Sequence, residues 1–264
     1  MFLNKLAQEG YRIFTYETIR PVATQEGYSE SYLNKILYLM AQSGQLQSFG
    51  NGLYALATEF LSGGPLHSFE IAMAIAKKGA ISYRSAMSFH GLSDQVTNSV
   101  YVKVPLCQGS NLSKKTHYDV GGVEVIIQRL HKEAFWGFNH YFIGEVSILI
   151  TDVERTLLDG LISPHLCGGF LEVIQAIRLA CSKISPRILL DYCEKFPTVV
   201  SKRLGWILDS YGISFSLLNP DGTITKDIID ILEAKPALTP QKLNPAGERR
   251  GHFNKKWMVL ENLV

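Results

Sequence analysis

The sequence predicts an α+β protein in which a module of three helices and a hairpin precedes a larger mixed domain, with a mostly antiparallel sheet and a C-terminal helical part. Three observations predict this class: amphipathic helical spacing at the N-terminus, strand-like segments in the middle, and a return of helical patterns from Asp152 onward. With 264 residues, 46% of them hydrophobic, the chain can bury a sizeable core as one large domain or two ordinary ones.

Two helices are expected first. The stretch FLNKLAQ spaces its apolar residues along one face of a short helix. A second helix should follow Thr15, whose side chain suits the N-cap position. Because Pro21 lacks the amide that an internal helical turn uses, the pattern leaves open one helix or two separate segments, 15–20 and 21–25.

The third helix has the clearest pattern, since Ser29 can cap it and Ser43 and Gly44 can end it. Its apolar residues recur at spacings of three and four, as on the buried face of an amphipathic helix: Leu33, Ile36, Leu37 and Met40. The opposite face carries side chains able to contact phosphates or base edges: Ser31, Asn34, Lys35, Tyr38 and Gln42.

A hairpin follows directly, in the stretch QLQSFGNGLYALA. Two short apolar runs flank Gly50, Asn51 and Gly52, residues that tolerate the positive φ of a tight turn. Three helices and a hairpin in this order are typical of a winged helix-turn-helix, which places its third helix in the major groove of DNA and its wing on the flanking backbone. A protein-interaction module that never meets DNA has the same order, so this alternative stays open.

The charge of the sequence helps to distinguish a DNA-binding module from a protein-interaction module. The net charge is only +2, and residues 1–60 carry more acids than bases: Lys5, Arg12, Arg20 and Lys35 against Glu9, Glu17, Glu26, Glu30 and Glu59. Neutralising phosphates normally takes several Lys or Arg side chains. The affinity of this module for DNA is therefore expected to be modest.

The stretch LSGGPLHS, residues 61–68, interrupts helix and strand patterns and predicts a boundary between domains 1–60 and 61–264. The larger domain begins with a helical pair, the second helix of which Ser82 can cap. It continues into the strand-like segments VYVKVPL, VEVIIQRL, HYFIG and VSILI, an α/β part over about 66–151. Strands so close in sequence favour antiparallel pairing. Helical patterns fill the part from 152 to 264, with Asp152 and Ser185 as N-caps.

A basic segment lies near the C-terminus, where Lys242 is closely followed by NPAGERRGHFNKKW. From residue 242 to residue 256 it has five basic residues against Glu248: Lys242, Arg249, Arg250, Lys255 and Lys256. Such a run is usually a solvated face, and it is also the best electrostatic candidate for a second contact with nucleic acid or an acidic partner.

No targeting or membrane segment is recognised, since no stretch approaches about 18 uninterrupted apolar residues. The four cysteines, Cys107, Cys167, Cys181 and Cys193, have neither CxxC nor metal-ligand spacing, which indicates buried or incidental thiols in a reducing compartment. We therefore expect a cytoplasmic protein without membrane contact.

A metal-dependent nuclease is the enzyme class kept as an alternative, with Asp119 and Glu124 as candidate metal ligands. Ile126 stands where such a site would place a lysine, which weakens this interpretation. Since no hydrolase, Walker or dinucleotide-binding glycine motif is present, the sequence predicts a non-enzymatic protein without a metal or other cofactor.

The carboxylates of DVERTLLD are explained by helix structure. Asp152 can cap the helix, Glu154 suits the first turn, and Arg155 can pair with Asp159 four residues on. His90, in SFHGL, ends a helix where a protonated imidazole can meet the last carbonyls, and it is interpreted as a structural histidine.

Several stretches together resemble the AbiEi antitoxins of bacterial type IV toxin-antitoxin and abortive infection systems. The likeness is carried by GLYALATEF, by ISYRSAMSFHGLSDQV, by ITDVERTLLDGL with GGFLEVIQAI after it, and by the ending GHFNKKWMV. These pieces span nearly the whole chain. Their order and spacing carry the resemblance more than any single piece does.

The resemblance implies a winged-helix DNA-binding domain followed by an antitoxin domain, in a non-enzymatic repressor of its own operon that binds inverted repeats in double-stranded DNA. It implies a nucleotidyltransferase-like toxin as functional partner, counteracted without a stable complex. Carried over by position, the DNA-facing residues are Ser31, Tyr32, Asn34, Lys35 and Tyr38 on the third helix, with Gln47 and Asn51 on the wing. Matching motif residues without an assigned role are Tyr83, Arg84, His90, Asp152 and Arg155.

Overall fold

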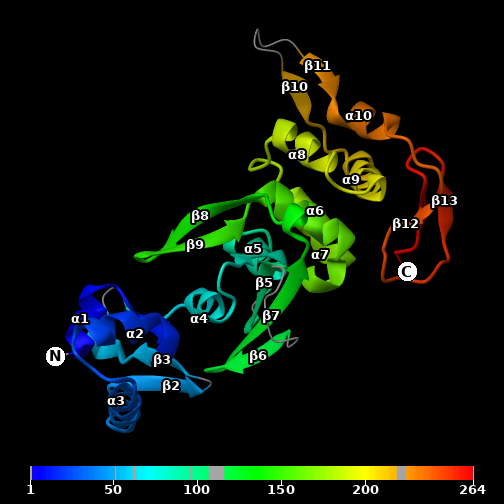
Figure 1. Ribbon diagram of the computed structural model, residues 1–264. Coiled ribbons are helices and arrows are strands. Elements are labelled where there is room, and N and C mark those ends of the chain that lie inside the picture. Colours follow the sequence, from blue (N-terminus) through cyan, green and yellow to red (C-terminus); the bar gives the residue numbers. More distant parts are fainter. Residues whose placement is uncertain are drawn as a thin grey trace. The chain divides into compact units, whose positions relative to one another are not determined.

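The computed structural model describes residues 2–50, 52–61, 64–95, 97–106, 116–218 and 224–263. The fold is mixed α+β, as the sequence predicted (Figure 1). The chain forms two compact units: unit 1 comprises Met1–Ile81, Asn98–Phe135 and His140–Leu149, and unit 2 comprises Ser82–Thr97, Trp136–Asn139 and Ile150–Val264. The boundary expected after residue 60 lies inside unit 1.

Three helices begin unit 1, at the places that the sequence predicted: α1 (Phe2–Gln8), α2 (Tyr16–Gln25) and α3 (Glu30–Gln42). The expected caps are confirmed, because the side chain of Thr15 accepts a hydrogen bond from the amide of Thr18, and that of Ser29 accepts one from Tyr32. The helices share a core in which Leu3, Leu6, Ile19, Leu33 and Leu37 are buried.

Helix α2 is continuous, which resolves the question that Pro21 left open. A proline inside a helix removes the hydrogen bond to the carbonyl four residues earlier. That carbonyl belongs to Glu17, an exposed residue in the first turn, where water can satisfy it. Pro21 is itself exposed, so its ring disturbs no packing.

The predicted hairpin is confirmed as β2 (Leu46–Gly50) and β3 (Leu53–Leu56), which pair antiparallel. A short strand that the sequence did not reveal, β1 (Ile13–Thr15), pairs with the other edge of β3, so that the strand order is β1-β3-β2. The turn residue Asn51 lies outside the described residues.

A six-stranded sheet with the order β6-β7-β5-β4-β9-β8 follows helix α4 (Ser68–Ile75). Its strands are β4 (Ala80–Ile81), β5 (Ser99–Pro105), β6 (His117–Val120), β7 (Val123–Leu130), β8 (Phe138–Ile143) and β9 (Val146–Thr151). Antiparallel pairing, as expected, joins β4 to β5 and β6 to β7, whereas β5 and β7 pair parallel. Strand β6 reverses the chain before β7, so β7 runs in the direction of β5.

Unit 2 is largely helical: α5 (Tyr83–Phe89), α6 (Val153–Ile162), α7 (Phe170–Leu179), α8 (Pro186–Cys193), α9 (Thr198–Ser210) and α10 (Ile228–Ala234). Short 3-10 turns cover Thr58–Phe60, Lys132–Ala134 and Pro164–Cys167. The C-terminal part is not all helical, since it holds two small sheets: β10 (Ser216–Leu218) with β11 (Ile224–Asp227), and β12 (Gln241–Lys242), β13 (His252–Asn254) and β14 (Val259–Glu261) in the order β12-β14-β13.

Helix α9 depends on a glycine for its packing. A Cβ atom at Gly205 would lie 1.9 Å from the ring of Trp257, which is fully buried. The indole of Trp257 donates a hydrogen bond to Asp209, one turn further along the same helix. The C-terminal strands are therefore attached to α9 by a large buried ring at a position that admits no side chain.

Of the helix caps predicted in the larger domain, one makes its capping hydrogen bond and two do not. Asp152 caps α6 as predicted, since its carboxylate accepts from the amide of Arg155 at 2.8 Å. Ser82 and Ser185 occupy the N-cap positions of α5 and α8, but their side chains make no capping hydrogen bond. The amide of Ser185 instead donates to the carboxylate of Glu154 at 2.6 Å.

The cysteines of the described residues are free thiols. Cys167 and Cys193 are buried and Cys181 is partly buried, as expected for structural thiols. Cys107 lies outside the described residues.

Candidate nucleic-acid interface

Helix α3 separates its two faces as the sequence predicted. Leu33 and Leu37 are 2% and 1% exposed, whereas Ile36 and Met40 are partly buried against the same core. The five candidate DNA-facing residues of the helix are all exposed: Ser31, Tyr32, Asn34, Lys35 and Tyr38. The structure therefore brings these side chains together on one solvent-facing surface, which we call the α3 face.

The candidate wing residue Gln47 is exposed on β2. Strand β2 begins four residues after the end of α3 and forms the outer edge of the sheet β1-β3-β2. Gln47 lies opposite Ala55 of β3, a fully buried residue. The hairpin therefore combines one buried strand with an outer strand that presents polar side chains to solvent.

Most basic side chains of residues 2–60 already have acidic partners. Lys5 pairs with Glu9 at 3.5 Å, and Arg20 pairs with Glu30 at 2.5 Å. Arg12 is held by Glu70 at 2.8 Å, and its side chain is only 11% exposed. Within the described part of the chain, Lys35 is the basic residue of this segment that has no ion-pair partner. It is consequently the cation best placed to contact a phosphate.

The α3 face is also rich in exposed apolar surface. Tyr32, Tyr38 and Leu39 are 50%, 62% and 53% exposed. The ring of Tyr32 is stacked on that of Tyr28, with centroids 5.6 Å apart. Such a surface can pack against bases, sugars or a protein partner, and its chemistry alone does not distinguish them.

The hairpin is attached to the rest of unit 1. Phe49 of β2 lies against the turn between β6 and β7, so that a Cβ atom added to Gly121 would lie 2.5 Å from its ring. Leu53 of β3, Ile71 of α4 and Val120 of β6 form a small buried cluster beside this contact. The base of the candidate wing is thus fixed by apolar packing.

Most basic side chains of the C-terminal basic segment already have a polar or acidic partner in the chain. Lys256 pairs with Asp209 at 2.9 Å, Arg250 pairs with Glu248 at 3.3 Å, and the ammonium of Lys242 donates to the carbonyl of Gly247 at 2.8 Å. Among the described residues, Arg249 and Lys255 are exposed and have no such partner. The cationic surface of this segment is therefore smaller than its composition indicates.

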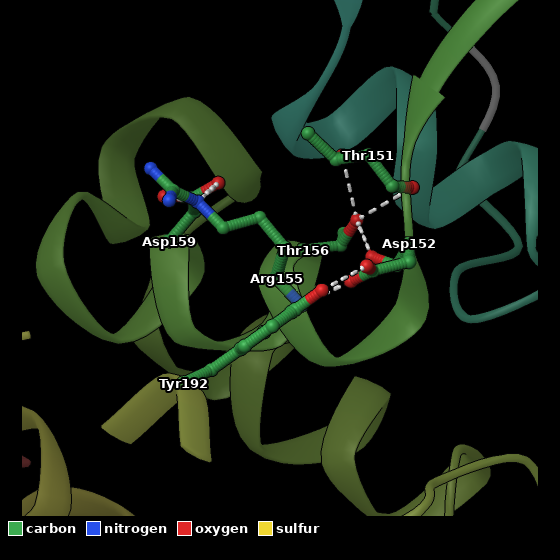
Figure 2. A network of polar contacts seen from close by, with 6 residues as sticks. All are labelled: Thr151, Asp152, Arg155, Thr156, Asp159 and Tyr192. Atoms are coloured by element: carbon green, nitrogen blue, oxygen red, sulfur yellow. Dashed lines mark hydrogen bonds and ion pairs between the residues drawn. The ribbon is translucent and has the colours of Figure 1, made fainter. Parts of the chain in front are cut away.

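The motif residues without an assigned role lie in unit 2, where Figure 2 shows one part of their polar network. Asp152 accepts from the hydroxyl of Tyr192 at 2.8 Å as well as from the amide of Arg155. Beside it, the hydroxyls of Thr151 and Thr156 lie 2.8 Å apart. Burial raises the pKa of Asp152, while the hydrogen bonds from Arg155 and Tyr192 oppose this shift. The network joins the end of β9, the start of α6 and helix α8.

Arg155 forms the predicted ion pair with Asp159, at 3.0 Å, and both side chains are buried. Its guanidinium carbon lies 3.9 Å from the ring centroid of Trp136 and 4.9 Å from that of Phe196. Stacking on aromatic faces suits the flat, weakly hydrated guanidinium. The motif arginine therefore fixes α6 against the Trp136 segment and the segment that follows α8.

The remaining motif residues of helix α5 join the same unit. The Nε2 atom of His90 lies 2.7 Å from the carbonyl oxygen of Thr151. Burial lowers the pKa of His90, which favours the neutral imidazole, and Nε2 donates this hydrogen bond. The ring thus meets a carbonyl of β9, and not the last carbonyls of its own helix as the sequence indicated. Tyr83 is buried with φ at +53°, and burial together with the nearby Asp159 raises its pKa.

Arg84 belongs to a second, more exposed network. Its guanidinium donates to the amide oxygen of Gln95, and the Gln95 amide nitrogen donates to Glu172 at 2.9 Å. The hydroxyl of Ser93 donates to the same carboxylate. Spacing of the motifs in sequence gave no sign of Gln95, Glu172 or Tyr192 as partners, because each contact joins residues from different helices or loops.

The alternative metal site has two exposed carboxylates. Asp119 and Glu124 are directly opposite each other in β6 and β7. The carboxylate of Glu124 accepts from the hydroxyl of Ser99 and lies 3.8 Å from the imidazole of His117. Over the residues that the structure describes, no three His, Cys, Asp or Glu side chains are grouped closely enough to hold a metal ion.

Comparison with known proteins gives information on the fold. No protein-family model matches the chain, and a search of curated proteins found no match. The structure is similar to the crystal structure of the RV2827C protein from Mycobacterium tuberculosis, with a TM-score of 0.65. The two sequences are 13% identical over an alignment that covers 98% of this chain and 89% of that chain. At this identity the likeness establishes a shared fold alone.

One further structural finding concerns membranes. In the described part of the chain, every helix is too short or too polar to cross a lipid bilayer.

Proposed function

We propose that residues 2–60 form a winged helix that binds operator DNA, with α3 in the major groove and the β2–β3 hairpin on the flanking backbone. The observation that carries this proposal is the α3 face: a row of exposed polar side chains, with Lys35 as its cation, directly followed by an antiparallel hairpin. The element order α1, β1, α2, α3, β2, β3 supports the same architecture.

In this proposal the residues of α3 and of the hairpin make different contacts with DNA. Lys35 contacts a phosphate and contributes affinity that is independent of sequence. Asn34 contacts a base edge, where an amide can pair with adenine in the major groove. Gln47 and Asn51 reach the backbone beside the groove. Since the other cations of residues 2–60 are paired, binding should be modest even in dilute buffer and should weaken further as salt is added.

The test is a titration of the upstream DNA fragment and of a scrambled fragment of equal length, at several salt concentrations. Lys35→Ala should weaken binding to both fragments alike, and Asn34→Ala should mainly erode the preference for the upstream fragment, by about 1 to 3 kcal/mol if the contact is bidentate. Lys5→Ala, which removes an equal charge from α1, is the matched control. Failure of the wild-type protein to bind the upstream fragment in dilute buffer would overturn the proposal.

We further propose that the protein is the autorepressor and antitoxin of a type IV toxin-antitoxin system, acts in the cytoplasm without catalysis, and counteracts a nucleotidyltransferase-like toxin without a stable complex. The resemblance of the motifs in residues 81–96 and 150–161 supports this role. Coexpression with such a toxin should restore growth. A variant with Lys35→Ala and Asn34→Ala should restore growth equally, because repression and neutralisation are placed in different parts of the chain.

A second candidate function is a protein-interaction module, favoured by the exposed rings of Tyr32 and Tyr38 and the exposed Leu39. Such a module would show no retardation of DNA, and its binding to a partner would change little with salt. The DNA titration described above separates the two candidates directly.

A further inference from the structure

A cavity of about 390 Å³ lies within unit 2, at the first turn of helix α9. It is lined by the start of this helix, with Thr198 and Lys202, and by the segment 236–239 that follows α10, with Met258 beside it. The described residues that line the cavity include no Asp or Glu. Cavities of this size hold small organic molecules.

Lys202 brings a buried cation to the cavity. The residue is only 4% exposed. Its ammonium donates hydrogen bonds to the carbonyls of Leu232 and Glu233, in the last turn of α10, at 3.4 and 2.8 Å. Because an ammonium group has three N–H donors, these two bonds leave one donor for a group bound in the cavity.

The charge of Lys202 has no ion-pair partner within the described part of the chain. Glu233 raises the pKa of Lys202, but burial lowers it and has the larger effect, and the carboxylate of Glu233 lies 3.8 Å from Lys256. The next residue, Arg203, is 6% exposed and donates to backbone carbonyls. A buried cation without a counter-charge is costly, so an anion bound beside Lys202 would be stabilised.

The other side chains of the cavity are mostly apolar. Leu238 is 97% exposed and lies between Pro236 and Pro240, so its side chain is free to cover a bound molecule. Val199 and Met258 add further apolar surface. A ligand that matches this lining carries its charge at one end and an apolar body at the other.

We infer that the cavity at the start of α9 binds a small organic carboxylate with an apolar body. The carboxylate accepts a hydrogen bond from the ammonium of Lys202 and lies near the amide end of the helix, where the helix dipole favours negative charge. The apolar body packs against Leu238 and Met258. Inorganic phosphate fits less well, since it has no apolar part and the cavity offers one cation. This site is separate from the proposed DNA-binding surface and does not depend on it.

The test is an NMR titration of the isotope-labelled full chain with hexanoate, a carboxylate with a short apolar body. A ligand this small should bind with a dissociation constant on the order of 1 mM. The amide signals of residues 198–202 and of Gln241 should shift in a saturable way. Hexanamide, which lacks the charge, and inorganic phosphate, which lacks the apolar body, should each bind about tenfold more weakly or worse.

Two variants test the cation and the mouth of the cavity separately. Lys202→Met removes the ammonium and should raise the dissociation constant of hexanoate about tenfold or more. Since this change also removes the bonds to α10, circular dichroism would verify the fold. Leu238→Asp leaves Lys202 intact, and the negative charge that it adds at an exposed position should raise the dissociation constant about threefold to tenfold. Leu171→Asp, at an exposed leucine of α7 outside the cavity, adds the same charge as a control and should leave the affinity unchanged.

Three results would overturn the inference. The first is the absence of saturable shifts at the start of α9 at hexanoate concentrations far above the expected dissociation constant. The second is equal affinity for hexanoate and hexanamide. The third is unchanged affinity in a folded Lys202→Met variant. If that variant does not fold, equal affinity in Leu238→Asp and Leu171→Asp decides against the site instead.

Discussion

The guanidinium of Arg20 lies 2.5 Å from the carboxylate of Glu30, which joins the middle of α2 to the first turn of α3. Both side chains are more than half exposed. In the proposed complex, this end of α3 is near the DNA backbone, where Glu30 repels phosphates and occupies an arginine that can bind them. The ion pair therefore limits the affinity of the candidate interface.

Replacing Glu30 by Gln should strengthen DNA binding. The change frees Arg20 for one more phosphate contact, which makes the salt dependence steeper by about 0.9 in the logarithmic slope. We expect an affinity gain of roughly threefold to tenfold at low salt. Glu9→Gln, which breaks the ion pair with Lys5 on α1, removes the same charge as a control. Equal gains in both variants would mean that the effect is one of overall charge.

The contact between Phe49 and Gly121 predicts a local effect on the hairpin. Gly121 and Gly122 both have positive φ, so alanine at either position strains the backbone by about 1 kcal/mol. Only at Gly121 would the new methyl group meet the ring of Phe49, since the space beside Gly122 is open. Hydrogen exchange of the β2–β3 amides should therefore be faster in Gly121→Ala than in Gly122→Ala. Equal exchange in the two variants would show that this contact does not hold the hairpin.

Local patterns predicted much of unit 1 and the helices of unit 2. The caps at Thr15, Ser29 and Asp152 were correctly located because a cap depends on residues only three positions apart. Strand β1 was missed, since three residues are too few to show a period. Strand β1 forms because it can pair with the free edge of β3, which lies far along the chain. The spacing of residues in the sequence does not reveal that pairing.

The same limit explains what was missed in the motif network. The ion pair of Arg155 with Asp159 follows from helical spacing and was predicted. The contacts of Asp152 with Tyr192, of Arg155 with Trp136 and of Gln95 with Glu172 join distant parts of the chain. They are set by how helices pack, so a single sequence cannot reveal them. The one parallel pair within the mostly antiparallel pattern, β5 with β7, was not predicted for a similar reason.

The buried guanidinium of Arg155 should not be replaceable by a lysine. A lysine keeps the charge but loses the flat surface on Trp136 and the geometry of the contact with Asp159. Arg155→Lys should lower the free energy of unfolding of unit 2 by about 2 kcal/mol. All three tryptophans, Trp136, Trp206 and Trp257, belong to unit 2, so their fluorescence during urea unfolding reports on it.

The control for this change is Arg178→Lys, at an exposed arginine whose guanidinium carbon lies 5.3 Å from the ring centroid of Tyr211. It should alter the free energy of unfolding by less than about 0.5 kcal/mol. Equal losses in the two variants would argue that Arg155 has no special role in holding the helices together.

The hydrogen bond from Tyr192 to Asp152 predicts a pH-dependent effect. Burial raises the pKa of Asp152, so ionisation of this carboxyl opposes folding as the pH rises through the raised value. Tyr192 favours the ionised form, and Tyr192→Phe should therefore cost about 1 to 2 kcal/mol of stability at pH 7. The loss should shrink as the pH falls, when Asp152 is protonated in both proteins. Urea unfolding at several pH values measures this, with Tyr211→Phe, at a partly exposed ring, as control.

The burial of His90 predicts how unit 2 responds to acid. Burial lowers the pKa of His90, so below its ordinary value of 6.5 the unfolded chain binds a proton that the folded chain does not. Stability should therefore fall as the pH drops from about 6.5 towards the lowered pKa, and the fall ends below it. The nearby Asp152 favours the protonated imidazole and Lys183 opposes it, but burial has the larger effect.

The variant His90→Gln isolates this contribution. A glutamine amide can donate to the carbonyl of Thr151 in place of Nε2, and it does not titrate in this range. Its unfolding midpoint in urea, followed by tryptophan fluorescence, should fall less than that of the wild-type protein between pH 7.5 and pH 5.5, whereas the two proteins should respond alike above pH 7.5. An equal fall in both proteins would place the acid sensitivity elsewhere in unit 2. His140→Gln, which changes an exposed histidine of unit 1, controls for loss of an imidazole as such.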